Sequence, residues 1–156
     1  METSDNRPIL VPVDFSEESK AALLYACDLS VSEQQRLVVL HVVHDDGNGK
    51  MYRREADIAP MLPIHEIAEQ AMQDFIDDMN GKNTELDALK SAKTIIVDGL
   101  PVTRILEVAE QVNAGHIVVD GNDRSALSRM LNGSVSRLLV EDSPVPVTVF
   151  RSKDIA

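Results

Sequence analysis

Residues 37–43, Leu-Val-Val-Leu-His-Val-Val, are the stretch of the chain that decides its fold class. Four of the seven residues are valine, whose β-branched side chain favours an extended backbone. The run does not alternate between apolar and polar residues, so it predicts a strand that is buried on both faces. Such strands are typical of parallel sheets that have helices on both sides.

Shorter apolar runs recur along the chain, and segments with helical periodicity separate them. We expect further strands at residues 9–13, 94–97, 117–119 and 145–150. We expect helices at residues 16–31, 64–79, 101–109 and 133–141. Residues 45–63 have no clear period and are expected to form a long loop. The alternation of strands and helices predicts an α/β fold with a parallel sheet, in a single domain over residues 1–156.

The first two helices carry the most specific expectations. Ser16 is suited to cap the first helix, and Gly81 is expected to end the second. The apolar stripe expected on the first helix comprises Ala21, Leu24, Tyr25, Cys27 and Leu29. Because it lies on this stripe, Cys27 is expected in the core.

Composition narrows the classes of function. The chain has a net charge of −11 and a pI of about 4.7, so it repels polyanions and is not expected to bind nucleic acid. No apolar run reaches the roughly 18–20 residues of a membrane span, so no membrane insertion is expected. Residues 1–7 have no signal-peptide pattern, and the single cysteine excludes an internal disulfide. These features predict a cytoplasmic protein.

The segment from residue 120 to 136 contains the most informative motif. The segment begins with Asp120-Gly121-Asn122-Asp123-Arg124, and nine residues separate Asp123 from Gly133-Ser134-Val135-Ser136. Three further motifs stand elsewhere: Ile-Leu-Val-Pro-Val-Asp-Phe-Ser at 9–16, Gly-Leu-Pro at 99–101 and Pro-Val-Pro-Val at 144–147. Taken together, these motifs resemble those of the universal stress protein family, over nearly the whole chain.

The resemblance implies a Rossmann-like fold of the adenine nucleotide alpha hydrolase type, with strand order 3-2-1-4-5. It also implies a stress-response protein with a crevice for ATP or AMP at the carboxyl ends of the strands. The residues implied around the crevice are Pro12, Val13, Asp14, Val42, Val119 and the segment 120–136. In nucleotide-binding relatives, the positions matching Asp14 and Val42 hold the adenosine part. The positions matching Gly133, Ser134 and Val135 hold the phosphates.

The glycine loop departs from the family pattern. ATP-binding members carry glycine at the positions that Asp120 and Asp123 occupy here. Two like charges about 4 Å apart near a surface repel by roughly 4 kcal/mol. Arg124, or a Mg²⁺ ion that bridges the carboxylates to phosphate, would offset part of this repulsion. The alternative is that the aspartates cap turns in a loop without ligand.

The phosphate end also has two interpretations. Gly133 lets the backbone approach an anion closely, and the N–H groups of Ser134 and Val135 would point outward from a helix start. Alternatively, Ser134 is only a helix cap and Gly133 only a turn residue.

Three functions therefore stay open. The first is a protein that acts by binding adenine nucleotide without turnover, and the others are a weak ATP-hydrolysing enzyme and a ligand-free interaction module of the same fold. No catalytic residue is predicted, because no Ser-His-Asp, Cys-His or P-loop pattern occurs. A phosphate-accepting receiver domain is disfavoured, since the residues after Asp14 are Phe-Ser and the last strand lacks a lysine.

No metal site is predicted either. His41 and His44 lie three residues apart, so on a strand they point to opposite faces. Asp45 and Asp46 follow them in the loop. His65 and His116 are isolated in the sequence and are expected at the surface.

The last strand carries an expectation about assembly. Pro144 and Pro146 confine residues 145–150 to a sheet edge, and the apolar residues from Val145 to Phe150 would leave that edge exposed. A homodimer that pairs two copies of this strand would cover it, as the family resemblance also implies. The alternative is that Phe150 folds back onto its own helix.

Overall fold

The computed structural model describes residues 6–44, 64–82, 86–121 and 135–151. The helices and strands in chain order are β1 Ile9–Pro12, α1 Glu17–Glu33, β2 Leu37–Val43, α2 Ile64–Lys82, α3 Asp87–Lys90, β3 Lys93–Asp98, α4 Pro101–Gln111, β4 His116–Asp120, α6 Val135–Asp142 and β5 Val147–Phe150. The strands form one parallel sheet in the order β3-β2-β1-β4-β5, which confirms the expected fold class and strand order.

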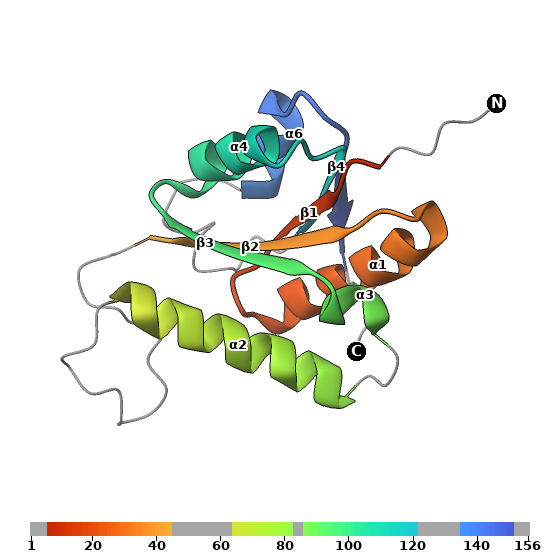
Figure 1. Ribbon diagram of the computed structural model, residues 1–156. Helices are drawn as coiled ribbons and strands as arrows, with labels where there is room; N and C mark the ends of the chain where they lie inside the picture. Colours follow the sequence, from red (N-terminus) through yellow and green to blue (C-terminus); the bar gives the residue numbers. More distant parts are fainter. Residues whose placement is uncertain (1–5, 45–63, 83–85, 122–134, 152–156) are drawn as a thin grey trace.

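Helices cover both faces of the sheet, as Figure 1 shows. On one face, α1, α2 and α3 pack against one set of strand side chains, which includes Val11 and Val39. On the other face, α4 and α6 pack against the alternate residues, which include Leu10 and Leu40. All seven residues of β2 are buried, so the prediction of a strand covered on both faces is confirmed.

The buried face of α1 differs from the expected stripe. Cys27 is in the core as predicted, but Tyr25 is 37% exposed. The buried residues are Ser19, Ala22, Leu23, Ala26, Cys27 and Ser30. Counting only apolar residues missed the two serines, which bury at low cost because their hydroxyls donate to nearby backbone carbonyls.

Several boundaries also differ from the expected ones. Helix α2 continues through Gly81 to Lys82, since nothing there requires a left-handed backbone. The short helix α3 was not predicted. Strand β5 begins at Val147, because Val145 instead forms a tight turn in which its N–H and carbonyl both bond the Ser143 hydroxyl.

No helix among the described residues is both long and apolar enough to cross a bilayer.

Candidate functional site

Strands β1 and β4 are the central neighbours of the sheet, where the winding changes direction. They pair only at their amino-terminal ends, Ile9 with His116 and Leu10 with Ile117. Both strands continue beyond this ladder, β1 to Pro12 and β4 to Asp120, without further pairs between them. The two carboxyl ends therefore part at the place where ligands bind in sheets of this kind.

The turn after β1 is fixed by hydrogen bonds. The Val13 N–H donates to the Leu40 carbonyl at 2.8 Å, which prolongs the contact with β2. Asp14 Oδ1 accepts from the Ser16 N–H at 3.1 Å and from the Ser16 hydroxyl at 2.5 Å. Ser16 in turn caps α1, since its Oγ accepts from the Ser19 N–H at 3.1 Å. The Asp14 carboxylate is thus held half-buried at the start of the crevice.

His41 supports this turn from the neighbouring strand. Its ring is fully buried, and Nδ1 lies 2.8 Å from the Val13 carbonyl oxygen. Since a carbonyl only accepts, Nδ1 carries the proton and donates it. The ring also stacks on Phe15 at 4.2 Å between centroids, and Phe15 has a positive φ of 67°. Burial lowers the pKa of His41, so the imidazole is held neutral.

At the end of β4 the chain runs close against β5. Gly121 donates its N–H to the Phe150 carbonyl at 2.9 Å. A Cβ on Gly121 would lie 2.7 Å from Val149 Cγ1 and 2.9 Å from Arg151 Cγ. Only glycine fits this position without a shift of the Val149 and Arg151 side chains. Sequence reasoning gave Gly121 no role, although a glycine directly after a buried strand is a signal of close approach.

The implied site residues fall into two groups. Val42, Val119 and Val135 are 3%, 4% and 7% exposed, and their side chains pack in the core beneath α4 and α6. Pro12 and Val13 are also buried. The side chains of these five residues offer a ligand little surface. Both backbone groups of Val13 are already bonded, to the Leu40 carbonyl and to the His41 ring. Of the described candidates, only Asp14 and Asp120 carry half-buried polar side chains.

The remaining candidates, Asp123, Arg124, Gly133 and Ser134, lie outside the described residues. The crevice is therefore described on its β1, β2 and β4 sides.

The other ionisable candidates of the sequence take structural places. No three His, Cys, Asp or Glu side chains gather into a metal-binding group in the described parts of the chain. His116 is half-buried, with Nε2 at 2.6 Å from the Thr148 hydroxyl, so the expected surface position is wrong. Burial lowers the pKa of His116 and raises the pKa of Cys27 to about 11. The thiol is therefore unreactive in the folded protein.

The parallel sheet with helices on both faces defines a Rossmann-like α/β protein, and comparison with known proteins gives its family. The universal stress protein family model matches residues 5–151, so the chain belongs to that family.

Individual relatives match over nearly their whole length. The universal stress protein MJ0577 of Methanocaldococcus jannaschii is 25% identical, over 95% of this chain and 96% of its own length. The structure of UspA from Lactobacillus plantarum is 26% identical, with a TM-score of 0.65 over 96% of this chain and 100% of that one. A universal stress protein solved in complex with cAMP is 19% identical, with a TM-score of 0.62 over 92% of this chain and 96% of that one, which shows the shared fold.

A well-formed groove lies elsewhere on the molecule. It has a volume of about 570 Å³ and runs between α2 and β3, at the far edge of the sheet from β4. None of the residues implied around the crevice lines this groove, so the two are separate.

Proposed function

We propose that this universal stress protein binds an adenine nucleotide, ATP or AMP, in the crevice between β1 and β4 and acts through occupancy, without turnover. It would act in the cytoplasm, and a nucleotide in the crevice would alter the surface offered to a partner. The observation that carries the proposal is the anchored Asp14 carboxylate at the point where the two strands part.

The chemistry of Asp14 suits the adenosine part of the ligand. Both of its hydrogen bonds to described residues fall on Oδ1, which leaves Oδ2 to accept from a ribose hydroxyl or an adenine amino group. A carboxylate held by its neighbours loses little conformational freedom when a ligand binds. The buried backbone at Pro12 and Val42 would supply the remaining contacts.

The phosphate part would lie toward residues 120–136, where the sequence places Gly133 and Ser134 at a helix start. Asp120 and Asp123 would weaken this end through their negative charge. We therefore expect the two aspartates to reduce the affinity for ATP more than the affinity for AMP. The reference is a family member with glycine at both positions. A Mg²⁺ ion between the carboxylates and the phosphates would restore part of the ATP affinity.

Equilibrium binding of ATP and AMP, each with and without Mg²⁺, tests the proposal when combined with an assay for released phosphate. Occupancy without phosphate release supports it. Phosphate release that rises with the fraction of protein bound to ATP would make the protein a weak ATPase instead. No occupancy by either nucleotide at millimolar concentration would make it a ligand-free module of the same fold.

We also propose a homodimer that pairs through β5, but without the Phe150 side chain in the interface. The Phe150 ring stacks on the Tyr25 ring of α1, with 5.1 Å between the ring centroids. Phe150 therefore packs on its own chain, as the alternative expected, and does not contribute its side chain to a partner. The backbone groups of residues 146 and 150 face β4, and by alternation those of Val147 and Val149 point outward. Pairing of two copies would therefore use these two residues' N–H and carbonyl groups.

A further inference from the structure

The outer edge of β3 carries backbone groups that have no backbone partner among the described residues. Gly99 donates its N–H to the Val43 carbonyl of β2 at 3.0 Å. Because the N–H and the carbonyl of a strand residue point to one side and alternate along the strand, those of Thr94, Ile96 and Asp98 point away from β2. Strand β3 ends the sheet, and no backbone hydrogen bond joins this edge to any other part of the described chain. An open edge of this kind is a template for another strand.

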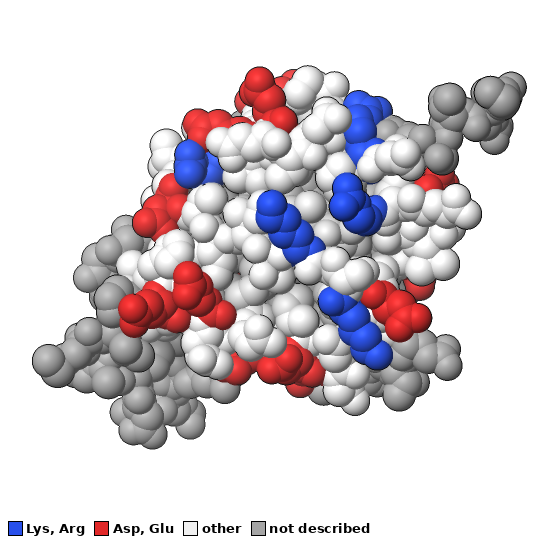
Figure 2. Space-filling view, in the orientation of Figure 1, with Lys and Arg blue, Asp and Glu red and all other residues white. Residues whose placement is uncertain are grey.

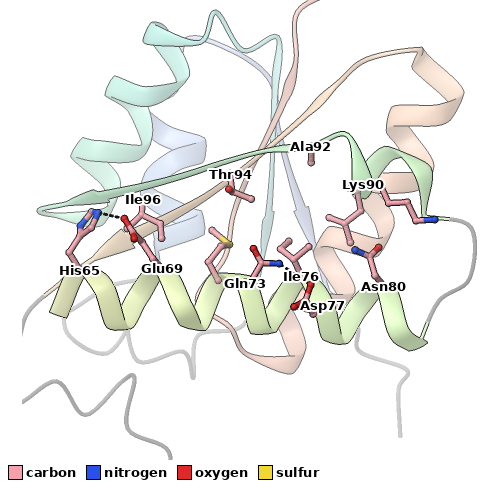
Figure 3. A pocket seen from close by; sticks show the side chains of 12 residues that line it. His65, Glu69, Gln73, Ile76, Asp77, Asn80, Lys90, Ala92, Thr94 and Ile96 are labelled. Carbon is pink, nitrogen blue, oxygen red and sulfur yellow. Dashed lines mark hydrogen bonds and ion pairs between the residues drawn. The ribbon is translucent and has the colours of Figure 1, made fainter. Parts of the chain in front are cut away.

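A groove runs along this edge. It has a volume of about 570 Å³ and lies between β3 and α2, as Figure 3 shows. One wall is a stripe of polar residues of α2 at four-residue spacing, His65, Glu69, Gln73 and Asp77. The opposite wall contains Thr94 and Ile96 of β3, and Ile76 lines the groove between them. Side chains of an added strand would enter this space, since they would lie beside those of Thr94 and Ile96.

The two ends of the groove differ. At one end His65 links the two elements, with Nδ1 at 3.2 Å from Asp98 Oδ1 and Nε2 at 3.2 Å from Glu69 Oε1. At the other end lie Asn80 and Lys90. Asn80 Oδ1 is buried and has no hydrogen-bond partner among the described residues. A buried acceptor without a partner lowers the stability of the fold.

The charge of the groove selects the ligand. Glu69 and Asp77 line it, Asp98 flanks one end, and Lys90 is the one lysine or arginine in its described lining. Figure 2 shows acidic side chains over α2, and basic side chains over the middle of the same face and near the carboxyl-terminal end of α2. A basic ligand would therefore be attracted. A second copy of this chain would bring its own acidic stripe and its net charge of −11 against this one, which disfavours self-pairing.

We propose that the outer edge of β3 and the groove beside α2 bind an extended peptide segment of a partner protein, as an added strand with lysine or arginine at alternate positions. The peptide backbone would pair with Thr94, Ile96 and Asp98. Its basic side chains would lie against Glu69 and Asp77. This mode gives affinity through main-chain hydrogen bonds and specificity through alternate side chains. It is independent of nucleotide in the crevice.

A short fluorescent peptide in which lysine alternates with threonine is the probe, and fluorescence anisotropy is the measurement. Thr94→Pro removes one outward N–H and leaves the ladder with β2 intact. It should weaken binding by about fivefold or more, which corresponds to one net hydrogen bond. The same peptide with glutamate in place of lysine should not bind.

A matched pair of charge variants tests the groove wall. Asp77→Lys and Asp74→Lys make the same charge change on α2. The Gln73 carboxamide donates to Asp77 at 2.9 Å, and the Gln70 carboxamide donates to Asp74 at 3.0 Å. Only Asp77 lines the groove. Asp77→Lys should weaken binding by roughly threefold to tenfold, and Asp74→Lys by less than about twofold.

Three results would overturn the proposal. These are equal binding of the glutamate peptide, unchanged binding by Thr94→Pro, and equal effects of the two lysine variants. Thermal melting checks that each variant is folded. If Thr94→Pro does not fold, NMR of the parent protein serves as the test in its place. The peptide should then change the amide chemical shifts of Thr94, Ile96 and Asp98 most. Dimerisation of the parent protein through this edge would also refute a peptide site. It would appear as a molecular mass that rises with protein concentration and does not fall when peptide is added.

Discussion

The imidazole of His41 donates a hydrogen bond of 2.8 Å to the backbone carbonyl of Val13. The contact joins β2 to the turn that follows β1, and the whole imidazole is buried. It therefore couples the stability of the sheet to the shape of the turn that carries Asp14.

Replacement of His41 by phenylalanine should destabilise the protein by about 1–3 kcal/mol. The variant keeps an aromatic ring for the stack on Phe15 but leaves the buried Val13 carbonyl without its donor. Urea unfolding measures the loss. His44→Phe, at the half-exposed position after β2, is the control and should change stability by less than about 0.5 kcal/mol. Equal losses in the two variants would contradict a special role for the His41 bond.

The pH dependence of stability should report the same histidine. Burial lowers the pKa of His41 below its ordinary value of 6.5, so the unfolded chain binds its proton at a higher pH than the folded protein does. The free energy of unfolding should therefore fall as the pH drops below about 6.5, until the folded pKa is reached. Urea titrations between pH 7.5 and about pH 5 measure this slope, and His41→Phe should make it shallower. An identical slope in the variant would show that other groups cause it.

Two glycines should respond in opposite directions to alanine. Gly121→Ala should cost about 1–3 kcal/mol, because the new methyl would lie 2.7 Å from Val149 Cγ1. Gly81→Ala should stabilise by about 0.5–1 kcal/mol, because Gly81 is helical within α2 and its Cβ would meet nothing within 4 Å. Thermal or urea unfolding of both variants measures the difference. A neutral Gly121→Ala would mean that β5 can move aside.

Replacement of Asp120 and Asp123 together by glycine should tighten ATP by about tenfold or more, because two negative charges leave the phosphate end of the crevice. Isothermal titration calorimetry measures the change. The Asp120→Asn, Asp123→Asn variant is the control for size, since it removes the charge and keeps the bulk. If charge dominates, it should recover most of the gain. A double glycine variant that binds ATP no better than the parent would refute the charge argument.

The proposed dimer should weigh twice the 17.2 kDa of one chain in light scattering at micromolar concentration. Lysine at both Val147 and Val149 should halve this mass, because the charges would meet across the pairing edge. Lysine at both Val31 and Val140, which are 70% and 54% exposed on helices, is the matched control and should leave the mass unchanged. A parent protein that stays monomeric at high concentration would end the proposal.

Local patterns in the sequence predicted the buried strand β2 and the start of helix α1. The β-branched run of β2 predicted a strand covered on both faces, and all seven of its residues are buried. Ser16 predicted the start of α1, and its hydroxyl does cap that helix. These features depend on neighbours in the chain, so periodicity and residue type report them directly.

Local patterns misplaced features that depend on distant partners or on the absence of one. Gly81 was expected to end the second helix, since glycine is common just after a helix. Helix α2 nevertheless continues through it, because no left-handed backbone is required there. Tyr25 was expected on the apolar stripe of the first helix, yet it is exposed and stacks on Phe150. Which side of a helix is buried is decided by how the helix rotates against the sheet, and apolar counting reports this only on average.

For the candidate site, motifs within short stretches of the sequence were enough to predict the family, and the resemblance implied which residues surround the crevice. Only the tertiary structure decided that His41 holds the turn before Asp14 and that β5 leaves no space for a side chain on Gly121. It alone brought α2 beside the open edge of β3 to form a groove. Each of these contacts joins residues more than ten positions apart. Their geometry is therefore set by packing between elements, which no local pattern encodes.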